Sequence, residues 1–198
     1  MKNLNQQLTK IAALLMIVTA AILPQRGAAQ TTYKLIADKE VNIKVLGSSN
    51  VHDWTMTSTA MESQGDFNLA DHHLQTLSFR LAVTSLKSEH ASMDDRTYKA
   101  VDAKKFPDIS YKLTAAEVTT VDAHKYLIKT KGNLTIAGAT QPISMDVTAV
   151  VNADNTITCS GSKKIQLTDY GIKPPTFMLG AMKVYNDLTI QFNLIYKK

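Results

Sequence analysis

Residues 77–84 read LSFRLAVT, and this stretch decides the fold class. Residues 77, 79, 81 and 83 of this stretch are apolar, whereas residues 78, 80, 82 and 84 are small or polar. Successive side chains of a strand point to opposite faces of a sheet, so a period of two predicts a strand with one apolar face. The same alternation recurs in residues 143–151 (ISMDVTAVV) and 188–194 (LTIQFNL). We therefore predict an all-β chain in which one face of each sheet is packed against the core and the other faces solvent.

Weaker alternation in five further stretches brings the number of candidate strands to eight. These stretches are residues 35–46, 51–59, 109–118, 126–136 and 156–167. The connections between strands are short and polar, which predicts hairpins between successive strands. We predict turns at residues 47–50, 122–124, 138–142 and 152–155. Even spacing with short connections favours an antiparallel up-and-down barrel over a Greek-key sandwich.

One short helix is expected among the strands. Residues 93–105 contain neither Gly nor Pro, and Pro107 stops the run. Ser92 is the predicted N-cap, and Asp95 would close a capping box three residues later. We found no repeats or linkers, which indicates one domain over residues 30–198.

The first 29 residues are expected to be a signal peptide that is removed on export. Lys2 and Lys10 precede a charge-free run over residues 11–23, which is too short to cross a bilayer. Pro24 and the small residues that end at Ala29 then provide a cleavage site. We therefore predict a periplasmic or secreted protein with no transmembrane anchor after cleavage.

The composition excludes some partners and covalent links. Loss of residues 1–29 would lower the formal charge from +5 to about +2, and no basic stripe is visible, so we expect no nucleic-acid binding. Cys159 is the single cysteine, which rules out a disulfide within the chain. It shares the parity of Ile157, and we favour a buried, inert thiol.

Four segments, in this order, resemble the YceI-like family of polyisoprenoid-binding proteins. They are residues 85–95 (SLKSEHASMDD), 105–111 (KFPDISY), 132–143 (GNLTIAGATQPI) and 167–175 (LTDYGIKPP). The resemblance implies an extended, lipocalin-like eight-stranded barrel. It also implies binding, storage or transport of a polyprenol or isoprenoid quinone in the cell envelope, without catalysis and with no cofactor besides the lipid. Residues 48–54 (SSNVHDW) depart from the His and Gly-x-Phe opening that is frequent in the family.

Alternation and resemblance together select residues for the interior of the barrel. We expect seven apolar residues to line it and contact the lipid: Phe79, Leu81, Val83, Met145, Val147, Ile190 and Phe192. The alternative is that they form a packed core. Four polar residues could form a rim that meets a lipid head group: Ser88, His90, Asp94 and Asp95. The alternative for these residues is helix capping and docking.

Two aromatic residues and a proline pair could close the barrel. Trp54 and Tyr170 could plug one opening or merely pack, and the loop at Pro174 and Pro175 could act as a lid.

Other functions have weaker support in the sequence. His72 and His73 are adjacent and point to opposite faces if extended, so we expect no metal site there. The nucleophile elbow and the phosphate-binding loop are both missing, so we expect no catalytic residues. The main rival is an interaction barrel with a packed core that binds a protein partner through its loops. A hydrolase or isomerase that acts on a lipid inside the barrel is a second rival. Two copies could also pair along a barrel edge as a homodimer.

Overall fold

The computed structural model describes residues 32–198. The predicted signal peptide, residues 1–29, lies outside the described residues. The strands are β1 (Thr32–Leu35), β2 (Asn42–Ser48), β3 (Asp53–Ser58), β4 (Met61–Asn68), β5 (His73–Ala82), β6 (Asp108–Asp122), β7 (Lys125–Ile136), β8 (Ala139–Val151), β9 (Ile157–Gln166), β10 (Thr176–Phe177), β11 (Met182–Lys183) and β12 (Asp187–Lys197). The helical segments are η1 (Val83–Ser85), α2 (Ala91–Ala100), η2 (Leu167–Tyr170) and η3 (Met178–Gly180).

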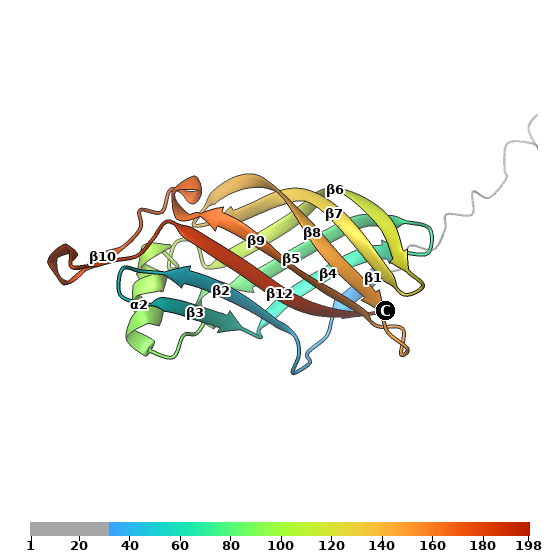
Figure 1. Ribbon diagram of the computed structural model, residues 1–198, viewed down its shortest axis with the longest axis horizontal. Helices are drawn as coiled ribbons and strands as arrows, with labels where there is room; N and C mark the ends of the chain where they lie inside the picture. The colour runs from blue at the N-terminus through green and yellow to red at the C-terminus, as the bar shows by residue number, and fades with distance from the viewer. Residues whose placement is uncertain (1–31) are drawn as a thin grey trace, which may run out of the picture. The chain divides into compact units, whose positions relative to one another are not determined.

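Eight antiparallel strands close into a barrel, which confirms the predicted fold class (Figure 1). β1 is followed round the wall by β4, β5, β6, β7, β8, β9 and β12. Pairing of Leu35 in β1 with Tyr196 in β12 closes the ring. Nearer the start of β12, residues 189–193 pair with β2. β3 in turn forms a hairpin with β2. Four neighbouring pairs of the wall (β4–β5, β6–β7, β7–β8 and β8–β9) are hairpins, as the short connections predicted. Longer segments lie between other neighbours: α2 between β5 and β6, and β10 and β11 between β9 and β12.

The apolar parity of each strand faces the interior. In β5 the buried positions include Phe79 and Leu81, and Arg80 between them is exposed. In β7 the alternation of buried and exposed residues runs without a break from Ile128 to Leu134. Burial of these side chains is the main favourable contribution to folding, at about 25 cal/mol per Å² of apolar surface.

Two features of the first strands differ from the prediction. The stretch 35–46 is split, because β1 ends at Leu35 and β2 begins at Asn42. The stretch 61–68 was not predicted, yet it forms β4. The inward positions of β4 include Ser63 and Gly65, which carry no hydrophobic signal. The outward residues of β4 are all polar or charged, but only the two end residues of its inward side are apolar, so the alternation of hydrophobicity is weak.

The turn predicted at residues 138–142 is shorter than expected. β8 begins at Ala139, and Pro142 lies within the strand opposite Asn133. The chain reverses at Ala137 and Gly138, which have φ of 49° and 77°. Positive φ at both central residues is the geometry of a two-residue hairpin whose twist matches its strands.

The helix α2 begins earlier and ends earlier than the sequence predicted. Its N-cap is His90, and neither a Ser92 cap nor a capping box with Asp95 forms, so this prediction was wrong. The reason is that Asp94, one residue before the predicted partner, is buried and accepts hydrogen bonds from Ser88. No helix within residues 32–198 has the length and apolar character that a membrane crossing requires.

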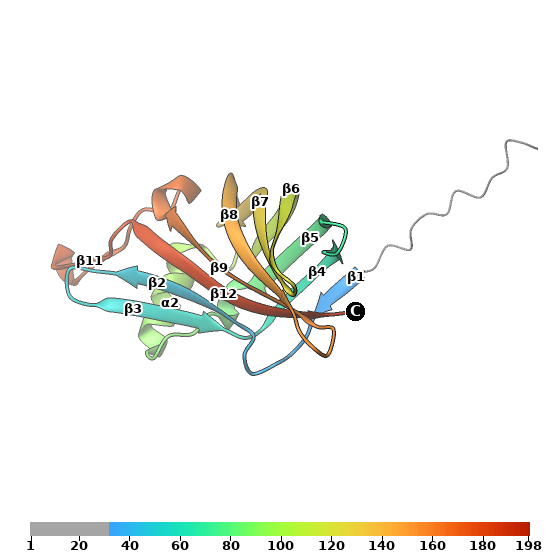
Figure 2. The same cartoon turned by 45° about the vertical axis from the view of Figure 1, so that its right-hand side comes forward.

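The wall is incomplete between β8 and β9. Their ladder runs only from Val147 opposite Gly161 to Val151 opposite Ile157, and beyond it the strands diverge (Figure 2). Side chains bridge the diverging part. Lys163 Nζ donates to the Ser144 carbonyl oxygen at 2.8 Å, and the Gln141 amide donates to the Asp169 carbonyl oxygen at 2.7 Å.

Candidate functional site: an apolar barrel cavity

The barrel encloses a cavity of about 340 Å³. That volume lies in the range of about 300–1,000 Å³ that is typical of small-molecule sites. Six of the seven residues predicted to line the barrel do border this cavity: Phe79, Leu81, Met145, Val147, Ile190 and Phe192. They come from β5, β8 and β12, so opposite walls contribute to one space.

Val83 is the exception among the seven. β5 ends at Ala82, and Val83 begins the short helical turn η1, where it is 1% exposed and packs in the core instead of bordering the cavity. Its amide donates to the Pro107 carbonyl oxygen at 2.8 Å. The strand therefore ends one residue before Val83, although Val83 is buried like Phe79 and Leu81.

The two ends of the cavity differ in chemistry. At one end of the barrel lie α2, the β2–β3 turn and the β10–β11 hairpin (Figure 1). The polar lining residues of this end are Ser49, His52, His90, Ser92, Arg96 and Thr97. We call it the mouth. The opposite end is closed by Phe67 and Tyr196, whose rings are 5.1 Å apart, and by the hydrogen bond of Tyr196 Oη to Ser63 Oγ at 2.8 Å.

Three residues that border the cavity have a buried side-chain donor with no well-formed hydrogen bond within residues 32–198. The donors are Trp54 Nε1, Tyr111 Oη and Tyr170 Oη, and of these Tyr111 interacts with the side chain of Thr130. Tyr111 is 6% exposed and Tyr170 is 3% exposed, and burial is the main reason that the pKa of each phenol is raised, to about 12 for Tyr170. Both phenols are therefore protonated donors at neutral pH. A buried donor without an acceptor is costly, so each favours an oxygen atom of a ligand.

The charged groups that border the cavity are cationic. Arg96 of α2 stands at the mouth, with its guanidinium 4.5 Å from the centre of the Phe177 ring. Lys163 of β9 is inward by parity, and its ammonium lies at the gap between β8 and β9. No Asp or Glu belongs to the lining formed by residues 32–198.

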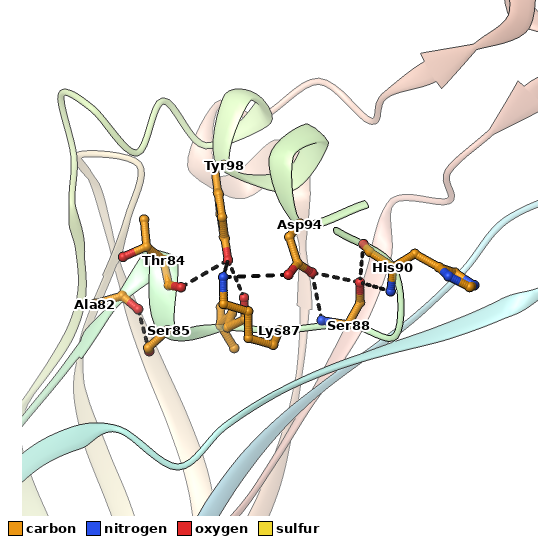
Figure 3. A network of polar contacts seen from close by, with 9 residues as sticks. Ala82, Thr84, Ser85, Lys87, Ser88, His90, Asp94 and Tyr98 are labelled. Carbon is orange, nitrogen blue, oxygen red and sulfur yellow. Dashed lines mark hydrogen bonds and ion pairs between the residues drawn. The ribbon is translucent and has the colours of Figure 1, made fainter. Parts of the chain in front are cut away.

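Two of the four residues predicted as a polar rim bind each other (Figure 3). Asp94 Oδ1 accepts hydrogen bonds from the Ser88 amide and from Ser88 Oγ, both at 2.7 Å. Lys87 Nζ lies 3.7 Å from Asp94 Oδ2 and donates to Tyr98 Oη at 2.9 Å. Neither Ser88 nor Asp94 borders the cavity. Their contacts fasten α2 to the segment before it.

The pKa of the Asp94 carboxyl group reflects these contacts. Burial alone would raise the pKa of the carboxyl group, but the two hydrogen bonds from Ser88 and the charge of Lys87 outweigh it and hold the pKa below its usual value of 3.8. Of the other two predicted rim residues, His90 borders the cavity and Asp95 is exposed outside it. Contact of these residues with a lipid head group stays a prediction.

The residues considered for closing the barrel all lie near the mouth. Trp54, Tyr170 and Pro175 border the cavity. Tyr170 ends η2, and Gly171 follows with φ of 69°, which turns the chain toward the proline pair. A movement of this loop as a lid stays a prediction.

Cys159 borders the cavity and is 4% exposed. Burial raises the pKa of its thiol to about 12, so it is a neutral, unreactive side chain at neutral pH. Residues 32–198 contain no group of three or more His, Cys, Asp or Glu side chains arranged to hold a metal ion. His72 Nε2 instead forms a hydrogen bond with Thr120 Oγ1 at 2.8 Å.

Comparison with known protein families identifies the type of barrel. The family described as the YceI-like domain matches residues 35–196, which span the mouth and all of the barrel wall except most of β1 and the end of β12. The chain belongs to the YceI-like family. A comparison with curated proteins finds no match.

Solved structures share this YceI-like fold at low sequence identity. BcnA of Burkholderia cenocepacia has a TM-score of 0.61 at 20% identity, and the match covers 77% of this chain and 95% of BcnA. The YceI protein of Campylobacter jejuni has a TM-score of 0.57 at 22% identity, with 70% and 82% covered. A polyisoprenoid-binding domain of Saccharophagus degradans, implicated in plant cell wall breakdown, has a TM-score of 0.62 at 12% identity, with 83% and 97% covered.

Several lining residues of this YceI-like barrel were missed from the sequence. Lys163 shares the parity of Cys159 and Ile165, so alternation was an available signal for its inward position. Phe177 and Met182 belong to strands of two residues, which are too short to show a period. The lining residues of α2 depend on where that helix crosses the mouth, which no local pattern encodes.

Proposed function

We propose that this protein holds the tail of a long-chain polyisoprenoid lipid, a polyprenol or an isoprenoid quinone, in its barrel and performs no chemistry on it. The observation that carries the proposal is the apolar cavity with polar groups at its mouth. Membership of the YceI-like family supports it, as does the likeness to a domain described as polyisoprenoid-binding. The lipid would be the single ligand, with no separate cofactor.

Burial of the apolar surface of the tail would hold it, and such burial needs no contacts of fixed direction. An isoprenoid chain has no hydrogen-bonding groups, so an apolar lining is sufficient to bind it. Each buried methylene contributes about 0.8 kcal/mol, and this gain accumulates along the chain. The flexible side chains of Met56, Met93 and Met145 suit a lining that adapts to a flexible ligand.

The polar end of the lipid would lie toward the mouth. The buried donors of Trp54 and Tyr170 lack acceptors, and a quinone carbonyl or a prenol oxygen would supply them. A site with buried donors discriminates strongly against ligands that cannot accept a hydrogen bond, because each donor would then be left unpaired. The bound lipid would therefore be oriented tail first.

The proposed location is the periplasm or the outside of the cell, after export by the signal peptide predicted in residues 1–29. A lipid carrier in that compartment could store or shuttle an isoprenoid through an aqueous phase. The absence of a catalytic role is likewise proposed, and membership of the YceI-like family supports it.

The first test is native mass spectrometry of the protein purified from the envelope of its own host. Solvent extraction of the same sample would then identify the bound molecule. We expect one polyprenol or quinone for each chain. A barrel that is empty and that takes up no added isoprenoid would contradict the proposal and favour the interaction barrel.

A pair of variants tests whether the cavity is the binding site. Met145→Trp adds bulk inside the cavity, and Ser144→Trp adds the same ring on the exposed face of the same strand. We expect Met145→Trp to lower lipid retention about tenfold or more, since an overfilled interior leaves no room for a chain. Ser144→Trp should retain lipid as the unmodified protein does. Equal retention by the two variants would place the lipid elsewhere.

A further inference from the structure

The β10–β11 hairpin has two different surfaces. Its inner side chains, Phe177 and Met182, border the cavity. Its tip, Met178 and Leu179, projects beyond the mouth, with Met178 75% exposed and Leu179 110% exposed (Figure 1). One short segment thus lines the lipid cavity and presents apolar side chains to the surroundings.

The exposed tip is held in place by the elements around it. Met178 and Leu179 both have positive φ, 53° and 55°, a conformation that non-glycine residues rarely adopt. The base of the hairpin is anchored by Asn50, whose side-chain amide donates to the Ala181 carbonyl oxygen at 2.8 Å and whose Oδ1 accepts from the Lys183 amide at 2.7 Å. An anchored backbone keeps the two apolar side chains pointing outward.

Other exposed apolar residues gather near this tip. Among residues 32–198, the large exposed hydrophobic side chains are Val51, Val121, Met178, Leu179 and Tyr185. Val51 lies in the β2–β3 turn and Tyr185 just after β11, and these segments are joined by the bridge of Ser49 with Val184. Four of the five therefore lie at the mouth. Scattered single hydrophobic residues need no explanation, but a cluster beside a binding site marks an interaction surface.

The charge of the hairpin region indicates the kind of partner. Residues 170–186 contain Lys173 and Lys183 and no acidic residue, and Asp169 and Asp187 lie immediately outside this stretch. Both lysines are exposed. Apolar side chains flanked by lysines are typical of proteins that rest on an anionic membrane surface, because the hydrophobic residues enter the acyl boundary and the cations meet the head groups. The tip is convex and two residues wide, which suits insertion between lipids better than a groove in a protein.

We propose that the hairpin tip docks the protein on an anionic lipid bilayer with the mouth of the cavity facing the membrane. Met178 and Leu179 enter the bilayer surface, and Lys173 and Lys183 contact anionic head groups. An isoprenoid could then pass between bilayer and barrel without exposing its tail to water. This purpose rests on the proposed function, but the docking itself does not. Two inserted side chains give weak, reversible attachment, as lipid exchange requires.

The test is sedimentation with vesicles of phosphatidylcholine, with and without phosphatidylglycerol. We expect the protein to bind the anionic vesicles and to bind much less to neutral ones. The double variant Met178→Ser, Leu179→Ser should lower the partition coefficient about tenfold or more, since it removes both inserted side chains. Val121→Ser is the matched control, because it removes an exposed apolar side chain from the β6 strand at the far end of the barrel and should leave vesicle binding unchanged.

Three outcomes would overturn the docking proposal. They are failure of the unmodified protein to bind anionic vesicles, equal binding by the double variant, and an equal loss of binding in Val121→Ser. A dimer in solution that the double variant abolishes, without vesicle binding, would instead show that the tip contacts a second copy. Circular dichroism melting would establish that each variant is folded.

Loading with an isoprenoid from detergent solution separates this proposal from the proposed function. The double variant should load from detergent as well as the unmodified protein does. If neither protein loads but vesicle binding depends on the tip, the lipid-holding proposal fails and docking stands.

Discussion

Three aromatic residues of the cavity lie against glycines, and this pairing sets the shape of the interior. A Cβ on Gly132 would overlap the ring of Tyr111, and a Cβ on Gly47 would overlap that of Trp54. Phe192 lies directly opposite Gly161 in the same way. Because glycine has no side chain, each ring can lie flat against the wall and leave the centre of the barrel open.

The substitution Gly132→Ala tests this arrangement at the scale of one residue. The added methyl group forces the Tyr111 ring toward the cavity, since the backbone of β7 is held by strands on both sides. We expect a loss of about 1–3 kcal/mol in the free energy of unfolding, as for other overpacked sites. Retention of bound lipid should also fall. Urea denaturation and lipid extraction measure the two effects.

Asn133→Ala is the matched control for Gly132→Ala, because Asn133 is exposed on the other face of the same strand. It should change stability by less than about 0.5 kcal/mol, as surface substitutions usually do. Equal effects of the two substitutions would mean that contact with Tyr111 is unimportant.

The position of α2 depends on one buried carboxylate. Asp94 ties the first turn of the helix to Ser88, and Tyr98 ties its later part to the carbonyl oxygens of Thr84 and Leu86 at 3.0 and 2.7 Å (Figure 3). These contacts hold α2 across the mouth, where Arg96 borders the cavity. The polar cluster is thus a structural support for the lining that α2 provides.

Asp94→Asn should destabilise the protein in a pH-dependent way. The pKa of Asp94 is lowered in the folded state, so its ionised form stabilises the fold above its usual pKa of 3.8. That stability is lost as the pH falls through the lowered value. At pH 7 we expect a loss of about 1–3 kcal/mol from the weakened hydrogen bonds. The difference from the unmodified protein should shrink below pH 4.

Denaturant titrations at several pH values measure this difference. Asp95→Asn serves as the control, because Asp95 is exposed and neighbours Asp94 in the same helix. A pH-independent difference for Asp94→Asn would contradict the role of its charge.

The whole barrel is expected to gain stability from its ligand. A bound lipid would fill the cavity of about 340 Å³ and could accept hydrogen bonds from the unpaired donors of Trp54 and Tyr170. A ligand at a hundredfold excess over its Kd adds about 2.7 kcal/mol of stability. For a domain of this size, that gain corresponds to a rise in Tm of roughly 5–10 °C.

Calorimetry of delipidated and reloaded protein checks this rise in Tm. The size of the shift should follow the logarithm of the lipid concentration. The Met145→Trp variant should show little or no shift, because its cavity is filled by the new side chain. A rise of the same size in that variant would mean that the lipid stabilises the protein from another site.

The local pattern of the sequence was sufficient for the wall of the barrel. Alternation in residues 77–84, 143–151 and 188–194 predicted three strands and the direction of their side chains, because a strand shows its two faces within a few residues, although the first strand ends at Ala82. Six of seven predicted lining residues border the cavity for the same reason. Family resemblance supplied the closed form, since alternation alone does not distinguish a barrel from a sandwich.

Contacts between distant segments decided the rest. β4 escaped prediction because Ser63 and Gly65 face inward beside Tyr196 and Phe67, which are large enough to fill the space. The start of α2 followed from the bond between Asp94 and Ser88, not from the strongest local cap. The mouth was predicted only in part. Trp54, Tyr170 and His90 were expected at an opening, but their assembly with α2 and the β10–β11 hairpin depends on separate segments that meet only in three dimensions. The face of a strand on which a side chain lies follows from the alternation of its neighbours in the sequence. The shape of a cavity depends instead on which strands face each other and on which glycines leave room for a ring.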